Sequence, residues 1–185
     1  MSTIFTIGHS TRTLSDFLEM LGAHGVQLLV DVRRYPGSRR YPHFAKEALA
    51  ASLAAENIGY VHEPDLGGRR RPRPDSPHTF WRSASFRAYA DYMETGPFQE
   101  ALGRLIAESQ ERTAAIMCAE AVPWRCHRQL IADSLVARGH EVRNILSATR
   151  ADLHVLNPAA AVLADGRLLY SARPDGEPQR LLDLG

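Results

Sequence analysis

The sequence contains very little lysine. Lys46 is the only lysine among 22 basic side chains, which are balanced by 21 acidic ones for a formal net charge of +1. This balance gives no overall sign of a nucleic-acid or membrane partner. All the other basic residues are arginines, whose planar guanidinium groups suit carboxylate and phosphate partners better than an ammonium group does. Genome base composition alone can produce such a bias, so the positions of the arginines decide its meaning.

Cysteine and long apolar runs are also scarce. Cys118 and Cys126 are the only cysteines in 185 residues, which excludes a disulfide scaffold and fits a reducing compartment. No apolar run approaches the roughly 18 residues of a membrane span, and the first residues lack the pattern of a secretory signal. We therefore expect a cytoplasmic protein with no membrane partner.

Glycine-rich nucleotide fingerprints are absent, since neither GxGxxG nor GxxxxGK[ST] occurs in the chain. The hydrophobic fraction of 44% and the charged fraction of 23% are those of a folded globular protein. A chain of this length builds a full core without metals or disulfides. We expect one domain with no cofactor.

The hydrophobic pattern alternates between strands and helices. Thr13 is the expected N-cap of the first helix, because Asp16 follows three residues later and an apolar helical stripe begins at Leu14. This alternation predicts an α/β fold of three layers, with a mostly parallel sheet flanked by helices. The pattern predicts strands at 4–7, 28–32, 59–62, 114–118 and 142–145, and helices near 14–21, 45–53, 86–93, 98–106 and 125–138.

Two segments fall outside this alternation. Residues 63–84 show no apolar periodicity, and a loop of this length is usually functional or disordered. Near the C-terminus, Asp165 and Gly166 separate two apolar runs, which predicts a β-hairpin. We expect a single α/β domain over residues 1–150 and an extension over 151–185 whose hairpin packs on the same domain.

Groups that can bind or react follow the predicted strands. His9 and Ser10 follow the first strand, Asp31 and Arg33 lie at the end of the second, and Cys118 ends the fourth. Ligands of open parallel sheets bind beyond the carboxyl ends of the strands. We therefore expect these side chains to share one site.

The arginines concentrate in one part of the chain. Residues 33–87 carry eleven basic and five acidic side chains, a net charge of +6, so the remainder is acidic. We interpret this segment as part of an anion site, in which Arg33 and Arg39 bind phosphate together with Arg128. The alternative is a solvated loop whose arginines pair with surface carboxylates. Arg33, next to a buried strand, is the arginine that we expect to be held in place.

The turn at His9 has two interpretations. Between a strand and a helix, it can present the imidazole of His9 and the backbone N–H groups near Ser10 to an anion. Alternatively, Ser10 caps a turn and His9 hydrogen-bonds to the backbone. The sequence leaves both interpretations open.

The segment CAEAVPWRCHR, residues 118–128, is the most distinctive part of the chain. A thiol between a strand end and a helix start is in the setting of a reactive cysteine, although Cys118 fits equally well as a small core residue. Glu120 and His127 are placed for acid–base work. Arg125 stands one position too far from Cys118 for the loop of cysteine phosphatases, which argues against covalent phosphate chemistry.

The same segment allows two further interpretations. A reversible disulfide between Cys118 and Cys126 is compatible with their spacing. Zinc would need a fourth ligand beside these cysteines and His127, and neighbouring cysteine and histidine residues are poor geometry for one tetrahedral ion. We therefore expect no metal.

Three strings of the sequence resemble one known family. They are TIGHSTRTLSDFLEMLGAHGVQLLVDVRRYPGSRRYPHF, YVHEPDLGGRR and CAEAVPWRCHRQLIADSLVARGHEV. In order and in register over about residues 4–146, they resemble the bacterial domain of unknown function 488. The resemblance implies a fold and a site, but no reaction. The positions that match the family's signature are Gly8, His9, Ser10, Asp31, Arg33, Pro36, Arg39, Leu66, Gly67, Gly68, Cys118, Glu120, Cys126, His127 and Arg128.

These features favour an enzyme, a hydrolase or a transferase, that acts on a phosphate-bearing or nucleotide-like substrate. Its predicted catalytic residues are Cys118, Glu120, His127 and His9. Its predicted binding residues are Ser10, Asp31, Arg33, Arg39, Cys126 and Arg128.

Two other functions remain open at this point. A non-catalytic nucleic-acid-binding module would use the loop 63–84, with Arg69 to Arg73 following a backbone and Phe80 and Trp81 stacking on bases. A thiol-based redox or metal sensor would use Cys118 and Cys126.

Overall fold

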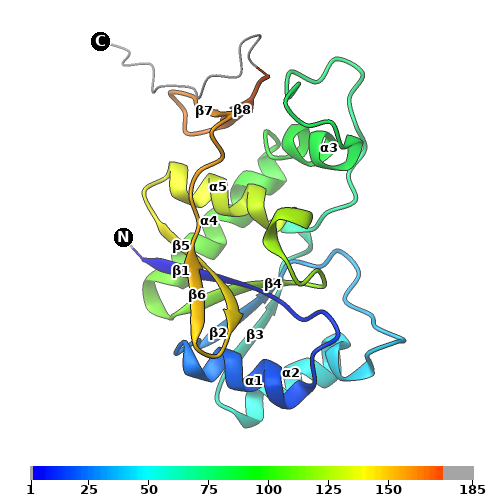
Figure 1. Ribbon diagram of the computed structural model, residues 1–185, viewed down its shortest axis with the longest axis vertical. Coiled ribbons are helices and arrows are strands. Elements are labelled where there is room, and N and C mark those ends of the chain that lie inside the picture. The colour runs from blue at the N-terminus through cyan, green and yellow to red at the C-terminus, as the bar shows by residue number, and fades with distance from the viewer. Residues whose placement is uncertain (1, 173–185) are drawn as a thin grey trace.

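The computed structural model describes residues 2–172 and shows one larger sheet, a small hairpin and helices on both faces of the larger sheet (Figure 1). The larger sheet has the strand order β3-β2-β4-β1-β5-β6. The first five strands run parallel, and β6 is antiparallel to β5. Its strands are β1 (Thr3–Gly8), β2 (Leu28–Asp31), β3 (Gly59–His62), β4 (Ala114–Cys118), β5 (Glu141–Ser147) and β6 (Arg150–Leu153).

The helices occur in the predicted order. Thr13 is the N-cap of the first one, because its hydroxyl accepts a hydrogen bond from the backbone N–H of Asp16 at 3.1 Å. Within residues 2–172, no helix has the length and apolar character needed to cross a bilayer. The helices are α1 (Leu14–Ala23), α2 (Lys46–Ala55), α3 (Ala84–Tyr92), α4 (Gly96–Glu111) and α5 (Arg128–Ala137), with short 3₁₀ turns η1 (Pro42–Phe44), η2 (Pro64–Leu66) and η3 (Pro123–Arg125).

The sheet separates two apolar cores. In β2, Leu28 and Val30 belong to the core that α3, α4 and α5 cover, whereas Leu29 belongs to the core under α1 and α2. Successive side chains of a strand point to opposite faces, so a strand buried on both faces is apolar throughout. The three-layer arrangement with a mostly parallel sheet is therefore confirmed.

The connections of the two central strands leave the sheet on opposite faces. β1 and β4 are neighbours, with Gly8 paired to Cys118 at their carboxyl ends. The chain continues from β1 into α1 on one face and from β4 into α5 on the other (Figure 1). A crevice at the strand ends follows from this divergence, and such crevices are where ligands bind in open α/β sheets.

The segments after β1 and β4 are in unusually close contact. The N–H of His9 donates to the carbonyl of Cys118 at 3.0 Å, and the N–H of Ser10 donates to that of Ala119 at 2.9 Å. A Cβ atom on Gly8 would lie 1.9 Å from the carbonyl oxygen of Glu120. Only glycine permits this approach, which fixes the two segments side by side.

Two elements differ from the sequence prediction. No strand was expected at 150–153, where β6 completes the sheet, because this short charged segment has little hydrophobic alternation. The last predicted helix begins at Arg128 rather than near residue 125. Pro123 starts the separate turn η3, and Cys126 is extended at φ −129° and ψ 147°.

The predicted hairpin is present as β7 (Ala160–Val162) and β8 (Leu168–Tyr170), with Gly166 in its turn at φ +80°. Tyr170 is fully buried. Its hydroxyl donates to Asp133 of α5 at 2.7 Å, and its N–H donates to His78 Nδ1 at 3.2 Å. The hairpin thus contacts both α5 and the loop 63–84. The end of the expected extension, residues 173–185, lies outside the described residues.

We predict that Gly8→Ala lowers the free energy of unfolding by at least about 3 kcal/mol, because the new methyl group must displace the backbone at Glu120. The matched control is Gly103→Ala in the middle of α4, where a Cβ meets nothing within 4 Å. This control should raise the free energy of unfolding by up to about 1 kcal/mol through helix propensity. Chemical denaturation measures both, and equal effects of the two substitutions would contradict the close contact.

Candidate functional site

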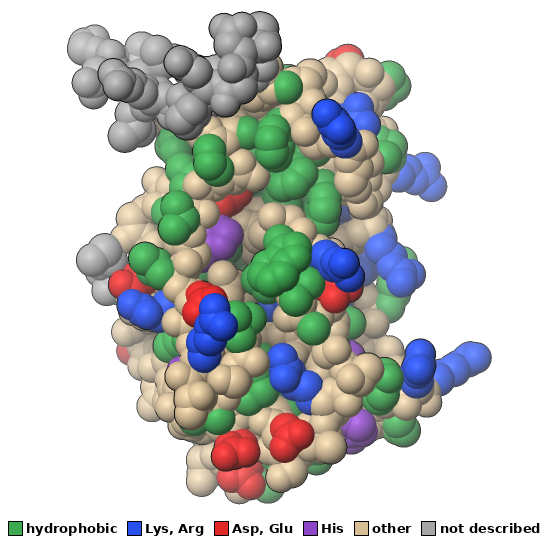
Figure 2. Space-filling model, viewed as in Figure 1, with side chains coloured by type: hydrophobic (Ala, Val, Ile, Leu, Met, Phe, Trp, Pro, Cys, Tyr) green, Lys and Arg blue, Asp and Glu red, His purple; other side chains and the backbone are tan. Residues whose placement is uncertain are grey.

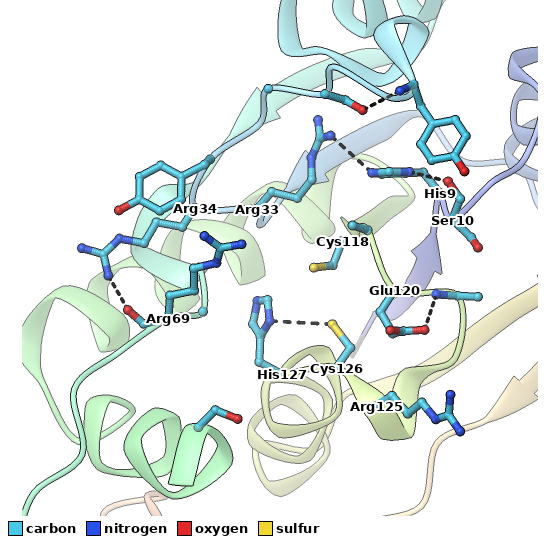
Figure 3. Close-up of a pocket in the computed structure, with 18 of the residues that line it drawn as sticks. His9, Ser10, Arg33, Arg34, Arg69, Cys118, Glu120, Arg125, Cys126 and His127 are labelled. Atoms are coloured by element: carbon cyan, nitrogen blue, oxygen red, sulfur yellow. Dashed lines mark hydrogen bonds between the residues drawn. The ribbon is translucent and has the colours of Figure 1, made fainter. Parts of the chain in front are cut away.

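The carboxyl ends of β1, β2 and β4 open into one pocket of about 770 Å³, which we call the strand-end pocket (Figure 3). It is lined by the segments that follow these strands, by the turn at Gly68, by the start of α3 and by η3. The structure therefore brings together most side chains that the sequence patterns singled out. The predicted site residues in its lining are His9, Ser10, Arg33, Cys118, Glu120, Cys126 and His127.

Arg33 is buried and held by Asp31 through two of its nitrogens. Nε donates to Oδ1 at 2.9 Å and Nη2 donates to Oδ2 at 2.7 Å. The hydroxyl of Tyr60 donates to the same Oδ2 at 2.5 Å, so the carboxylate is fully engaged. Asp31 does not line the pocket. It neutralises Arg33 and leaves Nη1 of the guanidinium as the nitrogen nearest His9, at 3.4 Å from Nε2.

His9 is a neutral imidazole with assignable proton positions. Burial lowers its pKa to about 4, and the Arg33 charge acts in the same direction, against a hydrogen bond to the backbone. Nδ1 lies 3.0 Å from the Ser10 carbonyl oxygen and therefore carries the proton. Nε2 is left to accept from Arg33. The ring also stacks on Phe44 with centroids 4.4 Å apart, so its orientation is fixed.

Cys118, Cys126 and His127 form a compact group that we call the thiol cluster. Their two sulfur atoms and a ring nitrogen all lie within 4.8 Å of one another, and Cys126 Sγ is 3.7 Å from His127 Nδ1. The hydrogen bond from Cys118, with His127 and Arg128 assisting, lowers the pKa of the Cys126 thiol. The same hydrogen bond and burial raise the pKa of Cys118. Of the two thiols, Cys126 is therefore the more acidic.

The ring of His127 is positioned by its neighbours. It precedes the first turn of α5 and packs 4.9 Å from the ring of Tyr89. A Cβ on Gly68 would lie 3.1 Å from Nδ1, so the glycine leaves room for the imidazole. Nε2 of His127 is buried and has no hydrogen-bond partner within the described chain.

Glu120 and Arg128 occupy opposite sides of the pocket wall. The carboxylate of Glu120 is exposed and reaches the N–H of Ala121 at 3.1 Å. Arg128 is buried beneath this wall and lies outside the lining. Its Nη2 donates to the carbonyl of Glu120 at 2.6 Å and its Nη1 to the hydroxyl of Thr6 at 3.3 Å. These contacts give Arg128 a positioning role for the segment after β4.

Arg39, predicted to bind substrate, is exposed and does not line the pocket.

Other arginines lie at the pocket. Nη1 of Arg34 donates to the carbonyl of Arg69 at 2.7 Å, and the guanidinium groups of both arginines lie 5.7 Å from the ring of Tyr35. Basic side chains also project on the right of Figure 2, the side toward which β1 runs. The charge of the 33–87 segment indicated this region, and its place beside a buried strand singled out Arg33, but no sequence signal distinguished Arg34, Arg40 and Arg69 from Arg39. The arginines in the lining besides Arg33 are Arg34, Arg40, Arg69 and Arg125.

The loop 63–84 is tied down by contacts within the chain. Arg70 lies 3.6 Å from the ring centroid of Tyr92 and donates to two carbonyl groups of η2 and its C-cap at 3.0 Å each. Arg73 pairs with Asp75 and Glu94. The loop's tryptophan, Trp81, is partly buried and packs between Phe86 and Tyr170. Arg70 and Trp81 are thus engaged within the fold, whereas Arg73 remains 46% exposed in ion pairs at the surface.

The chain belongs to the family described as domain of unknown function DUF488, whose model matches residues 13–135. This range contains β2 to β4 and most of α5. The segment Gly8–Ser10 precedes it, although the structure brings that segment into the same pocket. No curated protein and no solved structure matches the chain.

We predict that His9 stays neutral from pH 8 down to about pH 5. Its pKa in the folded chain, about 4, lies below the ordinary 6.5, so the unfolded chain binds the proton more readily. Above pH 6.5, His9 is neutral in both the folded and the unfolded chain, so its protonation does not affect the free energy of unfolding. As the pH drops toward 4, protonation in the unfolded chain lowers the free energy of unfolding by up to about 3 kcal/mol. Nuclear magnetic resonance of the ring protons measures the titration, and a midpoint near 6.5 would refute it. His9→Gln should show a shallower loss of stability over the same pH range.

Proposed function

We propose that this member of the DUF488 family is an enzyme, a hydrolase or a transferase, that binds a phosphate-bearing, nucleotide-like substrate in the strand-end pocket. The observation that carries the proposal is the charge of the lining. Five arginines line the pocket, and Glu120 is its only carboxylate within the described residues. Guanidinium groups bind phosphate through paired, charge-assisted hydrogen bonds.

Arg33 is the arginine best prepared to bind an anion. Nε and Nη2 both donate to Asp31, and this pairing holds the guanidinium in one orientation. Nη1 remains beside His9, whose neutral ring adds no positive charge of its own at this point. A phosphate oxygen that replaces the long contact to His9 would meet a preorganised donor, which lowers the entropy lost on binding.

The size and the aromatic rim support a nucleotide-like substrate over a bare phosphate. A pocket of about 770 Å³ falls in the range that accommodates small-molecule ligands and cofactors. The ring of Tyr35 is 63% exposed and lies 5.7 Å from the guanidinium groups of both Arg34 and Arg69. Such a rim offers a surface on which a base can stack.

The groups suited to chemistry lie across the pocket from Arg33. In our proposal, Glu120 moves a proton at the exposed rim, and the reaction takes place beside the thiol cluster. Both cysteines of the cluster are free thiols in the structure, which agrees with the proposed cytoplasmic setting. The anchored arginines and tryptophan of the loop 63–84 favour the pocket over a nucleic-acid-binding loop as the functional surface.

We predict that adenosine 5′-monophosphate binds the wild-type chain and that Arg125→Gln and Arg69→Gln each weaken its binding about tenfold. A charge-assisted hydrogen bond contributes about 1.5–3 kcal/mol, which covers this change. Arg39→Gln is the matched control, because Arg39 belongs to the same basic segment but lies outside the lining. Isothermal titration calorimetry at low salt measures the affinities. Equal weakening by all three substitutions would reduce the effect to overall charge and would contradict the pocket.

We predict that Glu120→Gln abolishes turnover while leaving nucleotide affinity within about twofold, because it removes a proton-transfer group without removing an arginine. Release of inorganic phosphate from a panel of nucleotides supplies the measurement. Glu111→Gln, an exposed carboxylate at the end of α4, is the control and should leave turnover unchanged. Full turnover by Glu120→Gln would remove this residue from the mechanism.

A further inference from the structure

The thiol cluster presents three donor atoms of the kind that soft divalent cations prefer. The side chains of Cys118, Cys126 and His127 point toward one another from the end of β4 and the start of α5 (Figure 3). All three line the strand-end pocket. Their common position makes the cluster accessible to an ion that enters through the pocket.

The adjacency of Cys126 and His127 does not keep their donor atoms apart. The backbone is extended at Cys126, with φ −129° and ψ 147°, and helical at His127, with φ −58° and ψ −14°. This change of conformation brings the two side chains to the same side of the chain, with Sγ and Nδ1 at 3.7 Å. A tetrahedral zinc ion with Zn–S of about 2.3 Å and Zn–N of about 2.0 Å places these ligands about 3.5 Å apart. The observed separation therefore matches one edge of a coordination tetrahedron.

We propose that the thiol cluster binds a soft divalent cation, zinc above all, through three protein ligands with the fourth position open to the strand-end pocket. Within the described residues no fourth cysteine, histidine or carboxylate joins the cluster. Structural zinc sites usually have four protein ligands, whereas three ligands and an open position are typical of catalytic sites. The metal site stands on its own geometry, and only its role toward a phosphate-bearing substrate rests on the proposed function.

The surroundings of the cluster suit the bound form. Two thiolates and one neutral imidazole balance the charge of a divalent cation, and the protons of the thiols are released on binding. The backbone N–H of Arg128 donates to Cys126 Sγ at 3.5 Å, which stabilises a thiolate and orients it. The open coordination position of the bound ion would face the pocket, whose lining contains the five arginines. A water or substrate oxygen bound at that position would therefore lie beside the proposed phosphate site.

Titration of the metal-free, reduced full-length chain with Co²⁺ tests the site. Cobalt in a tetrahedral site with thiolate ligands gives strong visible and near-ultraviolet absorption bands, and Zn²⁺ should displace it with loss of these bands. Cys118→Ser, Cys126→Ser and His127→Gln should each weaken Co²⁺ binding by at least about a hundredfold. His24→Gln is the matched control, because His24 bonds to the Ser147 carbonyl and lies outside the pocket. It should bind Co²⁺ like the wild-type chain.

A second measurement uses only the wild-type chain, in case a variant fails to fold. Excess Zn²⁺ should slow the alkylation of both cysteines by iodoacetamide at least tenfold, as followed by intact mass. Absence of cobalt bands, bands that persist in Cys126→Ser, or alkylation unaffected by Zn²⁺ would each overturn the proposal. So would a Cys118–Cys126 disulfide that forms equally fast with and without Zn²⁺, since that outcome identifies a redox pair.

The titration contains no phosphate, so the two proposals fail separately. Cobalt bands in a chain that does not bind adenosine 5′-monophosphate would retain the metal site and remove the proposed substrate. Nucleotide binding by a chain that gives no cobalt bands would retain the pocket and remove the metal.

Discussion

The close contact between the segments that follow β1 and β4 is the constraint on which the site depends. The missing side chain of Gly8 lets the carbonyl of Glu120 approach, and two backbone hydrogen bonds join His9 and Ser10 to the chain beyond Cys118. The parallel pairing of the strands ends here, and the chain leaves on opposite faces of the sheet. Without this contact the two walls of the pocket would have no fixed distance. With it, residues more than a hundred positions apart in sequence form one cavity.

Buried arginines maintain this geometry at both ends of the contact. Arg128 lies under the segment after β4 and satisfies the carbonyl of Glu120, which otherwise would be left without a donor at the end of the strand. Arg33 is neutralised by Asp31, because an unpaired guanidinium at this depth would cost several kcal/mol. Both residues are buried arginines, but their roles differ. Arg128 supports the backbone through Nη1 and Nη2, although its buried Nε has no partner within the described residues, whereas Arg33 is itself held by Asp31 and keeps Nη1 toward the pocket.

The sequence was sufficient for most of the fold because its strands are buried on both faces. Such strands appear as continuous apolar runs, and Leu28 to Val30 is a clear case in which neighbouring residues serve different cores. The edge strand β6 was missed because one of its faces is solvated and its residues Arg150 and Asp152 pair with each other. The other edge strand, β3, was predicted although it is only partly buried, because Tyr60 and Val61 are strong β-formers and Arg150 and Asp152 are not.

The sequence predicted the location of the candidate site better than it predicted which residues line it. Strand ends converge by topology, so His9, Arg33 and Cys118 were expected together without knowledge of any distance. Which arginines reach the pocket depends on loop conformation. Arg39, predicted to bind substrate, lies outside the lining, whereas Arg69, at φ +59° after the turn at Gly68, lies within it. The geometry of Cys126 and His127 likewise depends on one change of backbone conformation that no residue pattern specifies.

The proposed anion site and the proposed cation site are compatible within one pocket, because the ligands that they would hold have opposite charges. Five arginines give the lining a positive potential that favours anions. Two thiolates and a divalent cation are together neutral, so the bound ion adds no net charge against the arginines. A phosphate group could then be held by guanidinium groups on one side and approach the ion on the other.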